Sequence, residues 1–194
     1  VMHELPNRAQ MEKTLSALKA FGAPYGLVLN ELDGEGQLDT AAERMGKVFL
    51  STELRGAGSV NPFAIQVGDN GIRNILKHFG VLDIRRSRFT SYSCKKTPEI
   101  LTVPRETCFL SADEAGLYEP IKDLGDPLQP GDVLGQIHFV ANLRRKPLVI
   151  KAAESGRLIC RRVQGRVEIG DCVAVIGLPW TGIKAQNEGK TVEQ

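Results

Sequence analysis

The fold is decided by the stretch Leu128-Gln-Pro-Gly-Asp-Val-Leu-Gly-Gln-Ile137, which returns further along the chain as Val167-Glu-Ile-Gly-Asp-Cys-Val-Ala-Val-Ile176. In both copies a glycine precedes an aspartate and then an apolar run, which is typical of a turn that leads into a strand. A shorter pair, Ala112-Asp-Glu-Ala-Gly116 and Ala152-Ala-Glu-Ser-Gly156, precedes the two copies. The repeat predicts a small, closed β domain with pseudo-twofold symmetry over residues 111–177.

The amino-terminal half alternates helix-like and strand-like segments. Residues 26–32 and 47–54 are short apolar runs that predict buried strands, and helical patterns lie before, between and after them. This order predicts a parallel sheet covered on its faces by helices. Because two strands alone leave open edges, we expect strands upstream of Val1, or strands of another chain, to complete the sheet.

Three helices are predicted from signals at their ends. The first has apolar residues at spacings of three and four and stops at Gly22. Thr40 and Glu43 match a capping box at the start of the second. Asn61, followed by proline, predicts the start of the third. The apolar stripe of the third helix consists of Ile72, Ile75, Leu76 and Phe79.

Composition excludes several classes of protein. The chain has 194 residues, is 42% hydrophobic and 25% charged, and carries a net charge of +2, so nothing in its charge requires a nucleic acid or a membrane as partner. Uncharged stretches such as residues 21–30 are too short for a membrane helix, and we expect no secretory leader. The four cysteines form no C-x-x-C pair, which favours reduced thiols in a cytoplasmic protein: Cys94, Cys108, Cys160 and Cys172.

The repeated domain resembles the barrel-sandwich hybrid of biotinyl and lipoyl carrier domains. Those carriers hold the modified lysine between the two halves, often within Met-Lys-Met. Residues 138–148 contain no such triplet, and Lys146 lies beside a proline. A similar fold does not bring the same function, so we do not expect a swinging-arm carrier.

Longer segments carry a second resemblance. In order they read Ala20-Phe-Gly-Ala-Pro-Tyr25, Gly46-Lys-Val-Phe-Leu-Ser-Thr-Glu-Leu54, Gly71-Ile-Arg-Asn-Ile-Leu-Lys-His-Phe-Gly80 and Gly116-Leu-Tyr-Glu-Pro-Ile-Lys-Asp-Leu-Gly-Asp126. Together they resemble the succinylglutamate desuccinylase/aspartoacylase family of the zinc carboxypeptidase-like superfamily, particularly the N-acetyl-diaminobutyrate deacetylases of ectoine breakdown. The resemblance covers roughly residues 1–177 and corresponds to the later part of such a protein.

The resemblance implies an α/β fold followed by an all-β fold: a partial, parallel-sheet, carboxypeptidase-like domain and a small barrel-sandwich-hybrid-like β domain. Residues 1–82 would be the carboxyl-terminal part of the catalytic domain and residues 83–110 a connector. Residues 111–177 would be the β domain, and residues 178–194 a polar, flexible tail.

Glu53 is the catalytic residue that the resemblance implies. In the family, a glutamate at the end of a Ser-Thr-Glu-Leu-like strand acts as general base on a zinc-bound water and then protonates the departing amine. The carboxyl ends of strands are where open α/β sheets bind ligands, although Glu53 could also pair with Lys47 or Arg55 or cap a helix. Arg55 stands where relatives usually have glycine. Weak candidates for substrate contact are Arg55, Tyr118 and Glu119, and for the last two a structural role is equally open.

No zinc site is expected within this chain. The family ligands are a His-x-x-Glu pair and one later histidine, and none of His3, His78 and His138 is followed by glutamate three residues on. We expect His78 to be structural and His138 to face solvent. The resemblance thus implies zinc in the full-length family, no cofactor in this chain, and no activity of this chain alone.

Three functions follow from these observations. The first is an amide hydrolase that acts on a small-molecule N-acyl amino acid, such as N-acetyl-diaminobutyrate or succinylglutamate. The second is a non-catalytic binding or oligomerisation module built on the β domain, and the third is a homo-oligomer formed through the exposed sheet edge. A basic cluster could favour an anionic partner but is more simply explained as solvated strand edges. It comprises Arg144, Arg145, Lys146, Arg157, Arg161, Arg162 and Arg166.

Overall fold

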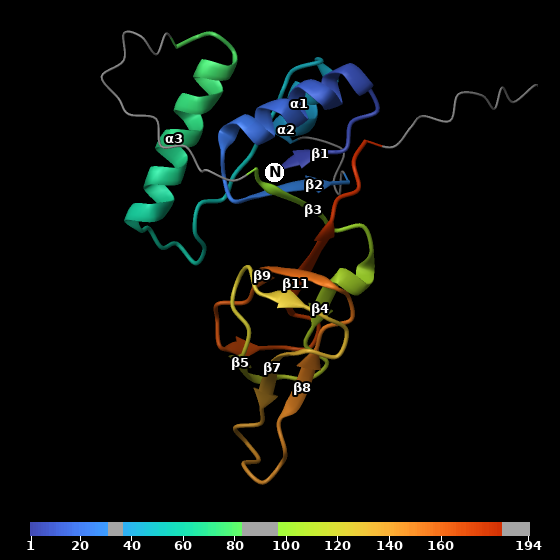
Figure 1. Ribbon diagram of the computed structural model, residues 1–194. Coiled ribbons are helices and arrows are strands. Elements are labelled where there is room, and N and C mark those ends of the chain that lie inside the picture. Colours follow the sequence, from blue (N-terminus) through green and yellow to red (C-terminus); the bar gives the residue numbers. More distant parts are fainter. Residues whose placement is uncertain (31–36, 83–96, 184–194) are drawn as a thin grey trace, which may run out of the picture.

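The chain folds into an α/β part and a β part that lie end to end (Figure 1). The computed structural model describes residues 1–30, 37–82 and 97–183. Within them, a mixed seven-stranded sheet runs through both parts, and an antiparallel four-stranded sheet completes the β part. The expectation of an α/β fold followed by an all-β fold is confirmed at this level.

The α/β part contains three parallel strands, β1 (Met2–His3), β2 (Tyr25–Leu29) and β3 (Glu99–Thr102). β2 lies between the other two and pairs with both in parallel. A parallel sheet was predicted and is present, but β2 is the one strand of it that the sequence predicted; β1 and β3 were not expected. β3 falls in the segment that the sequence suggested as a connector, because four residues are too few to show a strand pattern.

Helices cover this sheet and begin and end where capping residues permit. α1 (Arg8–Phe21) lies over the strands, and α3 (Pro62–His78) lies beside α1 (Figure 1). The side-chain oxygen of Asn7 accepts a hydrogen bond from Gln10 N at 3.0 Å, and that of Asn61 accepts one from Ala64 N at 2.7 Å. α1 ends at Gly22, whose φ of 82° is left-handed, as predicted.

The capping box predicted for the second helix is wrong. α2 (Leu38–Arg44) begins after Gln37, so Thr40 lies inside the helix and is only 4% exposed. Glu43, the other half of the predicted box, is turned toward His3 instead of back toward the helix start. A polar contact between residues 40 positions apart in the chain thus takes the place of the predicted local contact.

Residues 47–54 do not form the regular strand that was predicted. Val1 N donates to Ser51 O at 2.8 Å, and Ser51 N donates to Val1 O at 3.1 Å. Such a mutual pair is the antiparallel pattern. No hydrogen bond joins the backbone of Leu50 or Thr52 to another described residue. Among the described residues, this segment therefore pairs with one other strand segment, at Val1, through the backbone of Ser51.

β11 (Cys172–Pro179) connects the two parts of the molecule. Its last residues pair with β3, and its earlier residues pair with β4 (Phe109–Ser111) and β9 (Gly156–Arg161), all antiparallel. β6 (Pro127–Leu128) extends this sheet beside β9, and a 3-10 turn at Glu106–Cys108 precedes β4.

Residues 178–183, which the sequence assigned to a flexible tail, are part of the folded structure. Leu178 and Pro179 belong to β11, and Trp180 and Ile183 pack against the apolar cluster of the α/β part. Trp180 N also donates to Ile100 O at 2.9 Å. Apolar packing thus extends the ordered chain to Ile183, and residues 184–194 lie outside the described residues.

The four-stranded sheet has the order β10 (Arg166–Val167), β5 (Gly116–Pro120), β7 (Val133–His138) and β8 (Leu148–Lys151). All of its pairs are antiparallel. Among the described residues, none of the helices is both long enough and apolar enough to cross a membrane.

The two copies of the repeat make matching backbone contacts, each with the other copy. Ala112 exchanges two hydrogen bonds of 2.8 Å with the turn at residues 170–171, and Ala152 exchanges two of 2.8 Å with the turn at residues 131–132. Because each copy bonds to the turn of the other, the two copies are interlocked and do not stand side by side.

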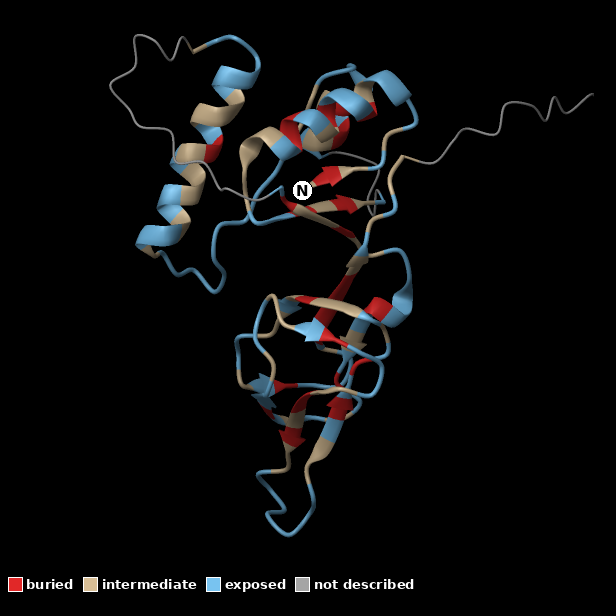
Figure 2. Ribbon diagram, viewed as in Figure 1, coloured by how far each residue is buried: buried red, intermediate tan, exposed pale blue. Residues whose placement is uncertain are grey.

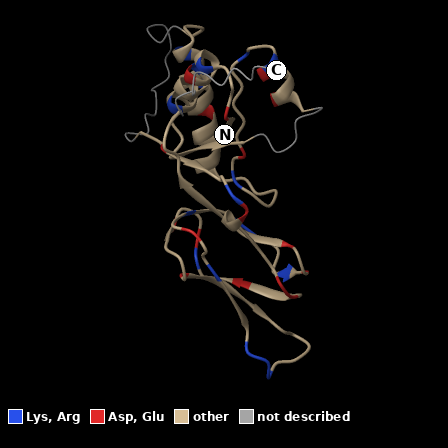
Figure 3. Ribbon diagram, turned by 90° about the vertical axis from the view of Figure 1, so that its right-hand side faces the viewer, with Lys and Arg blue, Asp and Glu red and all other residues tan. Residues whose placement is uncertain are grey.

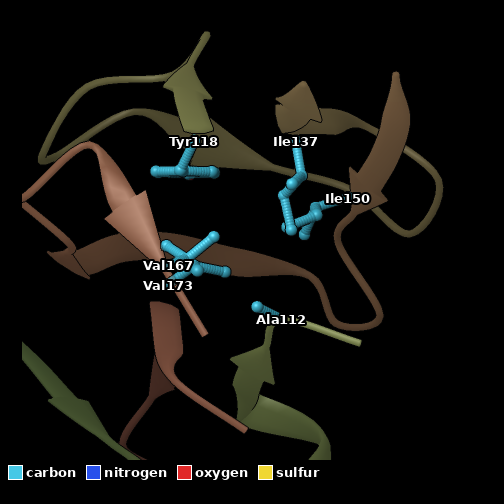
Figure 4. Packing of buried hydrophobic residues seen from close by; sticks show 6 residues of the cluster. All are labelled: Ala112, Tyr118, Ile137, Ile150, Val167 and Val173. Atoms are coloured by element: carbon cyan, nitrogen blue, oxygen red, sulfur yellow. The ribbon is translucent and has the colours of Figure 1, made fainter. Parts of the chain in front are cut away.

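The buried side chains of the two copies are also interlocked, because each core cluster of the β part contains residues of both copies. One cluster, seen in Figure 4, combines Ala112, Tyr118 and Ile137 of the first copy with Val167 and Val173 of the second. The other cluster combines Ala152, Leu158 and Ile176 of the second copy with Leu128 and Leu134 of the first. A third cluster, of Met2, Met11, Leu18 and Val28, forms the core of the α/β part. Figure 2 shows these buried positions in both parts.

Candidate functional site

Glu53 lies just beyond the Val1–Ser51 pair and is exposed. Because that pair is antiparallel, the chain reaches Glu53 at the edge of the sheet where β1 begins. Glu53 therefore does not lie with the carboxyl ends of β1 and β2, which was the expectation from sequence. The expectation was wrong because it assumed that residues 47–54 run parallel to the other strands.

The carboxylate of Glu53 has no hydrogen bond or ion pair with any described residue. Pairing with Lys47 or Arg55 and helix capping, the alternatives that the sequence left open, are thus not observed. An exposed carboxylate without a partner is able to accept a proton from a substrate or a water molecule. The catalytic assignment itself stays a prediction.

The backbone after Glu53 is strained. Arg55 has a φ of 75° and Ala57 a φ of 57°, and these are the positive-φ residues other than glycine within the described part of the chain. A left-handed conformation costs a side-chain-bearing residue about 1–2 kcal/mol, and such strain gathers at functional sites. The loop is closed by Ser59, whose N and Oγ donate to Gly56 O at 3.0 and 2.7 Å.

The charge of Glu53 acts on Cys160, a residue of the β part. Partial burial, together with the charges of Cys172 and Glu53, raises the pKa of the Cys160 thiol. Cys160 lies on β9. The raised pKa keeps this sulfur protonated near neutral pH, so Cys160 is not poised as a nucleophile.

Tyr118 and Glu119 lie on opposite faces of β5, as adjacent strand residues do. Tyr118 is 5% exposed within the cluster of Figure 4, and burial raises the pKa of its hydroxyl. The structural role that the sequence left open for Tyr118 is therefore favoured. Glu119 lies on the open face, where Gln136 Nε2 and His138 Nε2 are each 2.6 Å from its Oε2.

A polar group that the sequence did not reveal lies at the end of β1. His3 Nδ1 is 3.1 Å from Glu43 Oε2, and His3 Nε2 is 3.9 Å from Asp39 Oδ2. The side chain of Gln10 donates to Glu43 O at 2.9 Å and fixes the helix end that carries this carboxylate. These residues are far apart in sequence, so no local pattern could have shown the group.

The described residues do not fit a zinc site. Within residues 1–30, 37–82 and 97–183, no group of three His, Cys, Asp or Glu side chains is arranged to hold a metal ion. Each histidine has another partner. His78 Nε2 lies 3.4 Å from Ser16 Oγ and its ring packs edge-on against Phe79, and His138 contacts Glu119. Three protein ligands, the usual set for a catalytic zinc, are not brought together.

Most of the basic cluster is neutralised by ion pairs. Figure 3 shows acidic and basic residues interspersed over the β part. This pattern favours the simple surface explanation over an anion-binding patch. The pairs are Arg145–Glu114, Arg157–Glu99, Arg161–Asp123, Arg162–Asp171 and Arg166–Glu168.

The fold agrees with comparisons to known proteins. Residues 1–79 match the succinylglutamate desuccinylase/aspartoacylase catalytic-domain family. The chain is 35% identical over 175 residues to the N-alpha-acetyl-L-2,4-diaminobutyric acid deacetylase of Halomonas elongata, covering 90% of this chain and 49% of that protein. The family resemblance seen in the sequence is confirmed.

Solved structures lead to the same family. The product-bound ectoine utilisation protein EutE (DoeB) of Ruegeria pomeroyi matches with a TM-score of 0.81 and 36% identity, over 91% of this chain and 52% of that one. A succinylglutamate desuccinylase/aspartoacylase of Rhodobacter sphaeroides matches with a TM-score of 0.83 and 32% identity, over 93% and 53%. The chain therefore spans about half the length of the relatives it matches.

Proposed function

We propose that this chain supplies the general base of a deacylase that hydrolyses the amide bond of an N-acyl amino acid. One observation carries the proposal: Glu53, at the end of a Ser-Thr-Glu-Leu segment inside the family-matched residues 1–79, is exposed and has no partner among the described residues. The names of the relatives support the same reaction class.

In this reaction, water adds across the C–N bond and gives a carboxylic acid and an amine. The carboxylate of Glu53 accepts one proton from the attacking water and then gives it to the departing nitrogen, so that Glu53 returns to its charged form. Because the left-handed turn at Arg55 follows directly, the backbone there limits how far Glu53 can move.

We propose that zinc, if the reaction uses it, is held by residues outside this chain. The described residues do not fit a zinc site. The relatives are about twice as long as this chain, which leaves room for ligands in the part not spanned. The 194-residue chain alone is then expected to be inactive.

The first substrate to test is N-acetyl-2,4-diaminobutyrate, with N-succinylglutamate as the alternative. The Halomonas relative is named as a deacetylase of the former, and the Rhodobacter relative as a succinylglutamate desuccinylase/aspartoacylase. Identity does not separate the two substrates, because the Halomonas deacetylase and a succinylglutamate desuccinylase of Silicibacter sp. TM1040 are both 35% identical to this chain.

The test is a chimaera in which this chain replaces the matched region of the Ruegeria protein. We expect the chimaera to release acetate from N-acetyl-2,4-diaminobutyrate, and Glu53→Gln to lower kcat by roughly 100-fold or more. Glu12→Gln, the same change on the exposed face of α1, is the matched control and should leave kcat unchanged. Full activity of the Glu53→Gln chimaera would overturn the proposal.

We also infer that the β part is a barrel-sandwich hybrid without a carrier role. The crossed contacts of Ala112 and Ala152 support the interlocked halves of such a fold. Residues 138–148, between the halves, contain no Met-Lys-Met triplet. An intact mass without a biotinyl or lipoyl adduct is expected after expression with the ligases for both groups, and an adduct would contradict the inference.

A further inference from the structure

One face of α3 is apolar and uncovered. Ile65, Ile72, Leu76 and Phe79 are 59%, 61%, 37% and 49% exposed. With 3.6 residues per turn, these four positions fall on one side of the helix, and we call them the α3 stripe. Figure 2 shows α3 exposed along most of its length. An amphipathic helix normally buries such a stripe, so its exposure marks a contact surface.

The α3 stripe is not the side by which α3 is attached. α3 contacts α1 at Gly71, which is so close to the ring of Phe21 that a Cβ would collide with it. Asn74 Nδ2 also donates to Phe21 O at 3.2 Å. Positions 71 and 74 lie on a different face from residues 65, 72 and 76. The helix is thus anchored by its small and polar side and leaves its apolar side free.

The α3 stripe borders the loop that carries Glu53. A Cβ at Gly68, which follows Ile65 by one turn, would lie 2.7 Å from Leu54 Cδ1, so the Leu54 side chain rests directly on the helix there. Leu54 is itself 38% exposed and follows Glu53 directly. A partner that covers the α3 stripe would therefore reach the surroundings of the proposed catalytic carboxylate.

The same loop has an open backbone edge. Ser51 turns its N–H and C=O toward Val1, so in an extended chain Leu50 and Thr52 turn theirs to the other side. No hydrogen bond to a described residue satisfies those groups. A neighbouring extended segment could pair with this edge by strand addition.

We propose that the α3 stripe and this edge together dock the part of a deacylase catalytic domain that the chain does not span. That part would add a strand beside residues 47–54 and cover the stripe. Both features lie within residues 1–79, which match the family's catalytic domain, and the chain covers only 49–53% of the relatives' length. The proposal rests on the proposed function in that the docked part would complete the site around Glu53.

A second copy of this chain is the less favourable occupant. It would present the same open edge, the same stripe and the same three histidines, which form no metal-binding group in the described residues. A symmetric pair would bury apolar surface but would leave the surroundings of Glu53 without the groups that hydrolysis requires.

The experiment co-expresses the 194-residue chain with the part of the Ruegeria pomeroyi ectoine utilisation protein that lies outside the matched region. We expect the two polypeptides to purify together as a one-to-one complex. Ile72→Asp with Leu76→Asp should weaken association by about tenfold or more, because each places a charge in the apolar contact. Thr52→Pro, which removes a backbone donor from the edge, should weaken it as well.

Ile169→Asp is the matched control, because this isoleucine is 73% exposed in a turn of the β part. It should leave association unchanged. Three results would overturn the docking: no complex, a complex insensitive to the α3 variants, or a homodimer of this chain that Ile72→Asp dissociates. A variant-sensitive complex that hydrolyses neither N-acetyl-2,4-diaminobutyrate nor N-succinylglutamate would support the docking and count against the proposed function, so the two failures are distinguishable.

Discussion

At the scale of single residues, Glu119 links two strands through its side chain. Hydrogen bonds from Gln136 and His138 lower the pKa of the Glu119 carboxyl below its ordinary value of 4.5. A carboxyl whose pKa is lower in the folded state adds stability above its unfolded pKa and loses it as pH falls through the folded pKa. We therefore expect stability to fall below about pH 4.5, and Glu119→Gln to flatten that fall.

Urea unfolding between pH 3 and 7 measures this effect. The control is Glu168→Gln, because the carboxylate of Glu168 pairs with Arg166, two residues away, and should change the pH profile less. Identical slopes below pH 4.5 for wild type and Glu119→Gln would show that the contacts with Gln136 and His138 do not stabilise the folded state.

Single residues also show which helix ends a sequence pattern can predict. Asn61 and Gly22 act where predicted, because capping depends on backbone groups within a few positions. Thr40 does not, because its predicted partner Glu43 binds His3, a residue of another element. A local pattern predicts a local contact, and a stronger contact from elsewhere in the chain can replace it.

At the scale of elements, the two equivalent turns of the repeat should respond alike to mutation. Gly131 and Gly170 have φ values of 93° and 87°, and a Cβ at either would meet nothing within 4 Å. Gly131→Ala and Gly170→Ala should each cost about 1–2 kcal/mol of unfolding free energy, from backbone strain alone. Denaturant unfolding measures both losses.

Gly56→Ala is the matched control for these turns. Gly56 also has open space around a Cβ but is not among the positive-φ glycines. It should therefore be neutral or slightly stabilising. A loss at Gly131 without a similar loss at Gly170 would mean that the two turns do not share one role.

The elements that were hardest to predict are those whose structure depends on pairing with a distant segment of the chain. Residues 47–54 have a strand-like composition, but a strand exists only where a second chain segment pairs along it. Within the described part of the chain, Ser51 is the one residue of this segment that pairs in this way. β3 shows the converse, because its four residues carry little pattern and become a strand between β2 and β11. Pairing is a property of two segments, so one segment alone predicts it poorly.

At the scale of the whole molecule, Arg157 joins the β part to the α/β part. Its Nε donates to Glu99 Oε2 at 2.7 Å and its Nη1 donates to Gly125 O at 3.0 Å, and its guanidinium lies 5.9 Å from the centre of the Tyr25 ring. Arg157→Ala should make the amides of β2 and β3 exchange hydrogen faster, because a contact between the parts is lost.

Hydrogen exchange followed by mass spectrometry measures this coupling. Arg166→Ala is the control, since Arg166 pairs with Glu168 two residues away and has a side chain that is 86% exposed. Exchange in β2 and β3 should be unchanged by the control. Equal exchange in wild type and Arg157→Ala would show that the contacts of Arg157 do not couple the two parts.

The sequence was enough to propose Glu53 as a candidate, but it did not show what surrounds that residue. The Ser-Thr-Glu-Leu motif drew attention to Glu53, and the sequence alone left Tyr118 open between substrate contact and core packing. The fold favours the core for Tyr118 and sets Glu53 beside the α3 stripe, a relation between distant segments that no local spacing contains.

The crossed arrangement of the repeat bears on how this domain could have originated. Each of the two clusters of the β part takes side chains from both copies, and Ala112 and Ala152 each bond to the turn of the other copy. A polypeptide of one copy would lack half of every cluster, and two such polypeptides together would supply everything. Gene duplication and fusion of a self-associating ancestor would therefore preserve all of these contacts, and severing the chain between the copies should restore a two-subunit assembly rather than two independent folds.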